Sequence, residues 1–215
     1  MPKLNTPQTD WVRAQLKEKR NGYFIDIGAD DGMCASNTCL LERFYDWTGI
    51  CVEPNPRSNA FEYLKINRKC ICENVAVFSE NTEVEFIARV KKSQLSGILN
   101  PDFHGQAIEA VSQKHPVSII KAVTLKSILD KYNAPKIIDY ISIDTEGSEY
   151  EIIRVFPFDR YQFRLITIEH NAFTERDVDI KKQKNIRELL IANGYKLFPD
   201  NNYQAEDWFT MPSLL

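Results

Sequence analysis

The sequence predicts an α/β fold: a mostly parallel, doubly wound sheet of about seven strands with an antiparallel closing strand. Short apolar runs alternate with helical patterns along the whole chain. The run from Lys136 to Asp144 is nearly continuous in apolar residues, which is typical of a central strand covered on both faces. The length of 215 residues suits one domain with a full core, so residues 1–215 are interpreted as a single domain.

The first third of the chain predicts three helices that alternate with strands. Helical periodicity covers residues 10–20, 34–46 and 56–67, and Asn55 followed by Pro56 is a suitable start for the third helix. Strands are expected at residues 22–27, 49–53, 70–77 and 82–88. The first two strands come early and directly precede turns, so they are expected to carry a ligand site.

Residues 89–116 form a polar excursion between two predicted strands. Gly97, Pro101, Gly105 and Pro116 interrupt it, and a loop of this length in a compact domain is usually functional. We therefore expect a lid, in which Gly97 would be a hinge and Ser96 a hydrogen-bond donor to an acceptor substrate.

The second half of the chain continues the alternation. It predicts strands at 117–123, 136–144 and 163–169, and helices at 125–132 and 180–193. Ser148 and Glu151 have the spacing of a capping box for a helix that Pro157 ends, and Gly194 is a suitable C-cap. Residues 195–198 and 207–210 are expected to close the sheet as a hairpin-like pair.

Acidic side chains follow the first two strands. Asp26, Asp30 and Asp31 surround the turn after the first strand, and Ala29 and Asp30 separate Gly28 from Gly32, so the middle glycine of a dinucleotide fingerprint is missing. This acidity would repel phosphate and favours a cationic adenosine-like ligand, for which S-adenosylmethionine is the common candidate. Glu53 ends the second strand, where a carboxylate can accept both hydroxyls of a ribose.

Further polar side chains follow the strands at 136–144 and 163–169, where an acceptor would lie. His170 is a candidate general base because its ordinary pKa lies near neutrality. The alternative is a divalent metal such as Mg²⁺, held by Asp144, Glu169 and Asn171. Glu146 and Glu149 are candidate acceptor-binding acids, although both could instead stabilise the N-terminus of the following helix.

Composition excludes several classes of function. The net charge is −3 with no basic cluster, so we expect no nucleic-acid partner. No apolar run approaches the ~20 residues of a membrane span, and no secretory signal is evident. The five cysteines show no paired CxxC spacing, which indicates reduced thiols. We therefore expect a soluble, cytoplasmic protein.

Six segments, in order, resemble the FkbM family of S-adenosylmethionine-dependent methyltransferases, within the Rossmann-like class I methyltransferase fold. They are residues 22–32, residues 36–38 with 47–56, Asn67-Arg68, Leu95-Ser-Gly-Ile98, Asp139–Glu149 and Ile168-Glu-His-Asn171. The resemblance implies that Asp144 and Glu146 lie near the transferred methyl group. The cofactor set, from the residues and the resemblance together, is Asp26, Gly28, Ala29, Asp31, Ser36, Glu53, Pro54, Asn74, Val75, Ala76 and Asp144.

The resemblance also implies O-methylation, because characterised members of the family are O-methyltransferases and several act on sugar hydroxyls. The resulting hypothesis is methyl transfer to a hydroxyl of a glycan or glycoconjugate. His170, Asp144 and Glu146 are the expected catalytic residues, and the expected acceptor-binding residues are Ser96, Gly97, Glu146, Glu149 and Asn171. Alternatives are a lipid, polyketide or small-metabolite acceptor, a non-catalytic binding module, and membership of a larger glycan-assembly polypeptide or complex.

Overall fold

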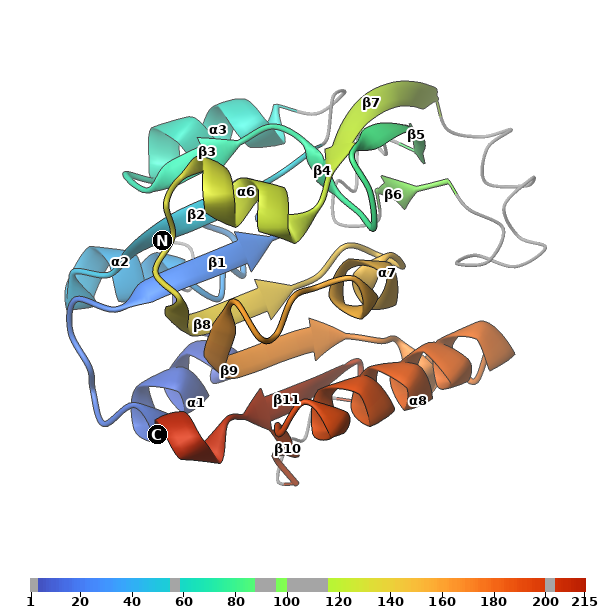
Figure 1. Cartoon of the computed structure of the whole chain (residues 1–215). Coiled ribbons are helices and arrows are strands. Elements are labelled where there is room, and N and C mark those ends of the chain that lie inside the picture. Colours follow the sequence, from blue (N-terminus) through green and yellow to red (C-terminus); the bar gives the residue numbers. More distant parts are fainter. Residues whose placement is uncertain (1–3, 55–58, 88–95, 100–115, 200–203) are drawn as a thin grey trace.

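A seven-stranded sheet forms the centre of the computed structural model, which describes residues 4–54, 59–87, 96–99, 116–199 and 204–215 (Figure 1). The strands lie in the order β10 (Lys196–Leu197), β11 (Glu206–Thr210), β9 (Gln162–Glu169), β8 (Ile137–Ile143), β1 (Tyr23–Ile27), β2 (Thr48–Val52) and β3 (Ile71–Glu73). Strand β11 is antiparallel to both of its neighbours, whereas β9, β8, β1, β2 and β3 are mutually parallel. The predicted mostly parallel sheet with an antiparallel closing strand is confirmed.

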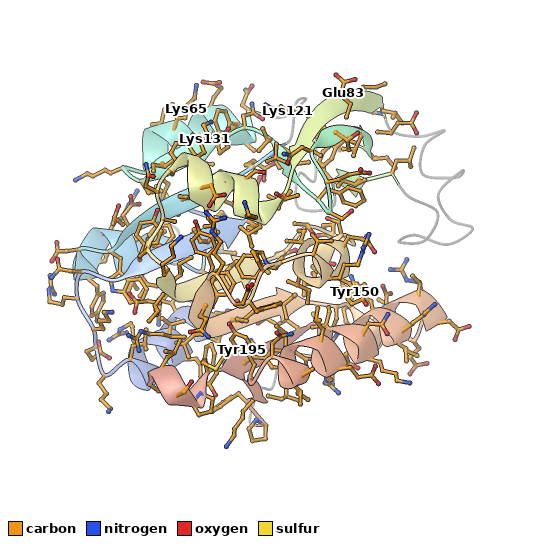
Figure 2. All side chains as sticks on the ribbon, viewed as in Figure 1. Lys65, Glu83, Lys121, Lys131, Tyr150 and Tyr195 are labelled. Carbon is orange, nitrogen blue, oxygen red and sulfur yellow. The ribbon has the colours of Figure 1, made fainter. Side chains whose placement is uncertain are left out.

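Helices cover both faces of this sheet (Figure 1). One face packs against α1 (Pro7–Gln15), α2 (Cys39–Tyr45) and α3 (Ala60–Asn67), and the other against α6 (Leu125–Lys131), α7 (Glu149–Arg154) and α8 (Asp177–Ala192). Successive side chains of β1 point to opposite faces of the sheet, so Phe24 packs in the core with α1, α2 and α3, and Ile25 packs in the core with α6, α7 and α8. Tyr195, labelled beside α8 in Figure 2, accepts the N–H of Phe163 at 3.0 Å and ties the end of α8 to β9.

A second, four-stranded sheet lies beside the carboxyl ends of β1, β2 and β8. Its order is β4 (Ala76–Val77), β7 (Val117–Val123), β5 (Thr82–Ile87) and β6 (Gly97–Ile98). The prediction of one strand over residues 70–77 is therefore wrong, because β3 stays in the main sheet while β4 pairs with β7. Strand β6 also falls inside the predicted excursion 89–116, whose remaining parts at 89–95 and 100–115 lie outside the described residues.

Helix ends differ from prediction where side chains bond to the backbone. The expected helix at 34–46 begins only at Cys39, because Ser36 Oγ accepts the N–H groups of Thr38 and Cys39 and holds a turn. The predicted capping box is wrong: Ser148 makes no side-chain cap bond. The C-cap is confirmed, since Gly194 has φ +88° and donates its N–H to Ile191 O at 3.0 Å.

Three smaller points complete the fold. The proposed start of the third helix at Asn55 and Pro56 lies outside the described residues. The hairpin-like closing pair is confirmed, because β10 pairs antiparallel with β11. Among the helices that the structure describes, none combines the length and apolar character needed to cross a membrane.

Candidate active site

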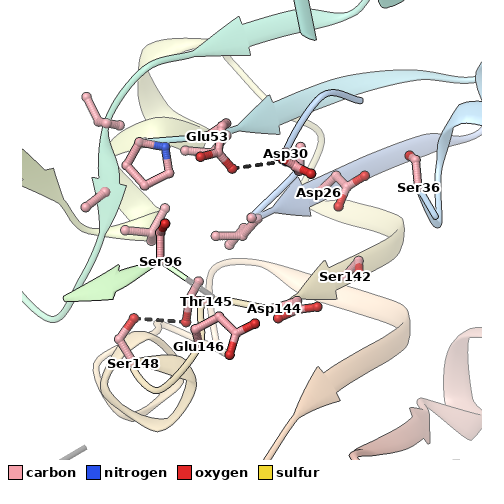
Figure 3. A pocket seen from close by; sticks show the side chains of 18 of the residues that line it. Asp26, Asp30, Ser36, Glu53, Ser96, Ser142, Asp144, Thr145, Glu146 and Ser148 are labelled. Carbon is pink, nitrogen blue, oxygen red and sulfur yellow. Dashed lines mark hydrogen bonds between the residues drawn. The ribbon is translucent and has the colours of Figure 1, made fainter. Parts of the chain in front are cut away.

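A cavity of about 300 Å³ lies between the carboxyl ends of β1, β2 and β8 and the small sheet (Figure 3). This volume is at the lower end of the range for small-molecule sites. Its lining includes nine of the predicted cofactor residues, Asp26, Gly28, Ala29, Ser36, Glu53, Pro54, Val75, Ala76 and Asp144, and also Ser96 and Glu146. The structure thus brings together residues that are up to 122 positions apart, from Asp26 to Ser148.

Gly28 is the point at which three strands converge. Its φ is +84°, and a Cβ atom there would lie only 1.7 Å from the carbonyl oxygen of Asp144. The N–H groups of Gly28 and Ala29 donate to Val52 O at 2.9 and 3.1 Å, while Asp144 N–H donates to Ile27 O at 3.0 Å. Glycine is required here by both the backbone conformation and the close approach of β8.

Glu53 stands at the end of β2 and is only 7% exposed. Its Oε2 accepts the N–H of Asp30 at 3.0 Å, which links the turn after β1 to the end of β2 (Figure 3). The carboxylate is therefore held in place at the cavity wall. This is the position at which the sequence predicts an acceptor for ribose hydroxyls.

A buried network supports the first acidic turn from behind. Thr38 Oγ1 donates to Asp26 Oδ2 at 2.6 Å, and Arg68 Nη2 donates to Thr38 Oγ1 at 2.9 Å. Arg68 also donates to Ser36 Oγ at 3.2 Å and forms an ion pair with the carboxylate of Glu42. Burial raises the pKa of Asp26, and the Arg68 charge acts against that rise. Arg68 lies in the Asn67-Arg68 segment noted in the sequence, but the sequence alone assigns it no function.

Two predicted cofactor residues do not line the cavity. Asp31 Oδ1 accepts the N–H groups of Met33 and Cys34 at 2.8 and 2.7 Å, so its carboxylate caps the turn instead. Asn74 is exposed in the connection between β3 and β4. Their neighbours Ala29, Val75 and Ala76 do line it.

Three carboxyl groups gather at the far end of the cavity. Asp144, which faces the cavity, lies in a group with Glu149 and Glu169 in which one oxygen of each is within 4.8 Å of the others. Glu149 is fully buried, and its Oε2 accepts from Lys182 Nζ at 2.8 Å. Its Oε1 accepts from Thr145 N–H at 2.9 Å and, with Gly147 N–H at 3.0 Å, fixes the loop after β8.

The protonation of these groups follows from burial and mutual repulsion. Although Asp144 is exposed to the cavity, desolvation by the surrounding protein, and then the Glu149 charge, raise its pKa to about 7. Burial, and then the Asp144 charge, raise the pKa of Glu169 well above its ordinary value. Although burial opposes it, the Lys182 ammonium and the backbone N–H groups hold the pKa of Glu149 below its ordinary value.

Two of the three predicted Mg²⁺ ligands come together in the structure. Asp144 and Glu169 come together, with Glu149 as the third carboxylate near them, and the part assigned to Asn171 stays a prediction. Both oxygens of Glu149 already accept hydrogen bonds, and the ammonium of Lys182 stands beside the carboxylates as their counter-charge. Glu169 Oε2 has no hydrogen-bond partner among the described residues, so Asp144 and Glu169 keep oxygens that Mg²⁺ could use together with water, and the metal stays a prediction through which we derive no chemistry.

The prediction of His170 as general base is wrong. Its side chain is 1% exposed and does not line the cavity. Nδ1 accepts the N–H of Ala172 at 3.0 Å, and Nε2 lies 3.1 Å from the Gln183 amide and 3.5 Å from Asp207 Oδ1. Both ring nitrogens are thus engaged inside the protein, where His170 joins β9 to α8 and β11.

The small sheet brings its edge against the loop after β8. Ser96 lines the cavity and is 9% exposed. A Cβ atom on Gly97 would lie 3.2 Å from the carbonyl oxygen of Glu146, which shows how closely β6 approaches this loop. The hinge role of Gly97 and the lid stay predictions, because residues 88–95 and 100–115 lie outside the described ranges.

Comparisons with known proteins complete the description of the site. The model of a family described as the methyltransferase FkbM domain matches residues 26–197, a range that contains every cavity residue. A search of curated proteins gave no significant match. A putative caffeoyl-CoA O-methyltransferase from Staphylococcus aureus is similar in structure, with TM-score 0.55 and 11% identity, covering 98% of this chain and 85% of that chain.

A second similar structure is precorrin-6y C5,15-methyltransferase from Geobacter metallireducens GS-15. It has TM-score 0.45 and 12% identity and covers 97% of this chain and 90% of that chain. At such low identity, structural likeness is evidence about fold alone. The Staphylococcus aureus structure and the strand order together confirm the predicted Rossmann-like class I fold.

Proposed function

The chain belongs to the methyltransferase FkbM domain family, and from this premise we propose that it transfers a methyl group from S-adenosylmethionine to a hydroxyl oxygen. The observation that supports the proposal most strongly is the cavity at the carboxyl ends of β1, β2 and β8, where ligands of such sheets bind. Its acidic wall, with Asp26, Glu53 and Asp144, suits a cationic donor and opposes a phosphorylated one.

The residues of the cavity fit the parts of this donor. Glu53 is suited to accept the ribose hydroxyls, as charge-assisted hydrogen bonds. Val75 and Ala76 offer apolar contact for an adenine, and Asp26 supplies negative charge near the turn at Gly28. When bound, S-adenosylmethionine supplies a methyl group made electrophilic by the positive sulfur.

Transfer to oxygen also requires that the hydroxyl proton be removed. Asp144 is exposed to the cavity, and desolvation by the surrounding protein together with the Glu149 charge brings its pKa to about 7. An ionised Asp144 can accept the proton while the hydroxyl oxygen forms its new bond to carbon, a role typically worth ~10²–10⁴-fold in rate. Ser96 and Glu146 line the same cavity and are proposed to orient the acceptor, which adds the advantage of alignment.

We propose a sugar hydroxyl of a glycan or glycoconjugate as the acceptor. The family resemblance supports this choice, and so do the polar groups on the acceptor side of the cavity, Ser96, Thr145, Glu146 and Ser148 (Figure 3). Phe86 and Ile98 add a small apolar surface, which keeps a lipid, polyketide or small-metabolite hydroxyl as the second candidate. The reaction would take place in the cytoplasm, alone or within a larger glycan-assembly complex.

Mass spectrometry of an acceptor panel tests the proposal. The purified chain is incubated with S-adenosylmethionine and monosaccharides, oligosaccharides, lipids and small alcohols, and a mass gain of one methylene on a saccharide is the expected result. Methylation of only non-saccharide hydroxyls would favour the second candidate. Donor binding by calorimetry without any product would favour a non-catalytic binding module.

Glu53→Ala is expected to weaken S-adenosylmethionine binding by about tenfold or more, because charge-assisted hydrogen bonds to the ribose are lost. Isothermal titration calorimetry measures the affinity. Glu83→Ala on β5, which removes an exposed carboxylate (Figure 2), is the matched control and should bind normally. An unchanged affinity of Glu53→Ala would remove the ribose role from Glu53.

A further inference from the structure

Asn37 lines the cavity, although the sequence assigns it no function. It lies in the turn before α2, directly after Ser36, and its Nδ2 donates to Ser142 Oγ on β8 at 3.1 Å. Ser36 and Ser142 lie on one side of the cavity in Figure 3, whereas Ser96 lies on the other. Asn37 therefore belongs to the polar side of the cavity that β1 and β8 form.

Helix α1 holds Asn37 from behind. Thr6, the N-cap of α1, donates its hydroxyl to Asn37 Oδ1 at 3.0 Å, and Thr9 donates its hydroxyl to the main-chain oxygen of Asn37 at 3.0 Å. Thr6 Oγ1 in turn accepts the N–H of Thr9 at 3.1 Å, and both threonines are buried. Because α1 precedes the range 26–197 that the family model matches, this hold on the turn comes from outside the matched range.

These bonds decide which way the amide of Asn37 is turned. Each threonine hydroxyl has one hydrogen, and the two hydrogens go to the two oxygens of Asn37. The amide oxygen consequently faces α1, and the NH₂ group faces Ser142. An amide nitrogen carries two hydrogens, and within the described ranges Ser142 accepts just one of them. The second hydrogen is available to a ligand in the cavity.

The group that this hydrogen would meet follows from how S-adenosylmethionine is placed in the proposed function. The strands lie in the order β3, β2, β1 and β8. With the ribose at Glu53 after β2 and the adenine at Val75 after β3, the amino-acid end extends toward β1 and β8. Its ammonium suits the acidic wall at Asp26, but that wall repels its carboxylate. A carboxylate accepts hydrogen bonds and therefore needs N–H or O–H donors at this side.

We propose that the amide of Asn37 binds the carboxylate at the amino-acid end of S-adenosylmethionine, and that Thr6 and Thr9 of α1 hold this amide in the required direction. Thr6 and Thr9 act through Asn37 and are positioning residues. The inference rests on the proposed function, because it requires this donor in the cavity. It gives α1 a part in donor recognition as well as in the core, where Trp11 and Val12 pack.

Two ligands that differ only at the amino-acid end make the test specific. S-adenosylhomocysteine carries the carboxylate and the ammonium, whereas 5′-methylthioadenosine ends in a methyl group, and the sulfur of both is neutral. Calorimetry on the full chain measures both affinities. Asn37→Ala should weaken binding of S-adenosylhomocysteine by about tenfold or more, because a hydrogen bond to a charged group is lost. Its affinity for 5′-methylthioadenosine should stay near that of wild type.

Asn37→Asp tests the sign of the charge that Asn37 meets. Aspartate has nearly the same shape, but it has no N–H and its negative charge repels a carboxylate. S-adenosylhomocysteine should therefore bind this variant more weakly than it binds Asn37→Ala. A higher affinity than that of Asn37→Ala would show that Asn37 faces the ammonium, and would overturn the proposal.

Thr6→Val and Thr9→Val test the part of α1 without changing the cavity lining. Each removes a hydroxyl that holds Asn37 and should weaken binding of S-adenosylhomocysteine by about two- to tenfold, again with little effect on 5′-methylthioadenosine. Thr9→Ser keeps the hydroxyl and should bind as wild type does. Thr124→Val is the matched control, because Thr124 is the N-cap of α6 and its Oγ1 accepts an N–H at 3.1 Å. It should bind both ligands normally.

The inference is also overturned if the Asn37 and threonine variants bind S-adenosylhomocysteine as tightly as wild type, or if they lose affinity for both ligands to the same extent, as a general disturbance of the cavity would cause. A wild-type chain that binds neither S-adenosylmethionine nor S-adenosylhomocysteine would instead count against the proposed function. The two failures are distinguishable, because the first is seen only against a wild type that binds.

Discussion

Asp144→Asn is expected to lower the rate of methyl transfer by ~10²–10⁴-fold, because asparagine keeps the shape of the side chain but cannot accept a proton. Asp144 is the acid that both faces the cavity and has its pKa brought to about 7, near the pH at which a base is most effective. Its position is fixed by the bond from its N–H to Ile27 O at 3.0 Å, so the substitution should not displace the loop.

Glu146→Gln is the matched control, because Glu146 is two residues away and lines the same cavity. It should mainly raise the KM for the acceptor, whereas Asp144→Asn should mainly lower kcat. Initial rates over a range of acceptor concentrations, together with donor affinity by calorimetry, separate these effects. A larger loss of kcat in Glu146→Gln than in Asp144→Asn would transfer the role of base to Glu146.

The acids at the strand ends could be predicted from the sequence because strand position and sheet topology decide where they lie. Asp26, Glu53 and Asp144 each come at or just after the end of an apolar run, and parallel strands bring such ends to one edge of the sheet. No contact between distant side chains is needed for this inference. The cavity residues were accordingly the most predictable part of the molecule.

Residues near a strand end were harder to predict, because successive side chains point in opposite directions. Glu169 is the last residue of β9 and turns toward Asp144, whereas His170 turns toward Gln183 on α8. The sequence favoured His170 as the base because it is the histidine that follows a strand at this edge of the sheet and because its ordinary pKa lies near neutrality. Desolvation by the surrounding protein and neighbouring charges instead brought Asp144 to that range.

Lys182 shows what the sequence could not reveal. It stands beside Lys181 in an amphipathic helix and has the pattern of a solvated side chain, yet it is buried against Glu149, 33 positions away. Such a long-range ion pair depends on how α8 packs against α7. The second sheet had the same difficulty, since the local pattern predicted strands but not the sheet that each would join.

Arg68→Met is expected to destabilise the protein by ~3–5 kcal/mol, because removal of one partner of a buried ion pair leaves the other charge unpaired. The side chains of Arg68 and Glu42 are 0% and 7% exposed, and Arg68 also donates to Thr38 and Ser36, which hold Asp26 and the turn before α2. Urea unfolding measures the change in the free energy of unfolding.

Arg43→Met gives the comparison that isolates burial, because Arg43 is exposed on α2 and donates only to Asn67 O among the bonds described. An exposed charge of this kind contributes roughly 0–1 kcal/mol.

Arg68→Lys keeps the positive charge but cannot reach Glu42, Thr38 and Ser36 together, so its stability should fall between that of wild type and Arg68→Met. The affinity for S-adenosylmethionine should likewise decrease from wild type to Arg68→Lys to Arg68→Met, because the Arg68 network positions Asp26. If Arg68→Met proved no less stable than Arg43→Met, the turn would be held by the backbone alone.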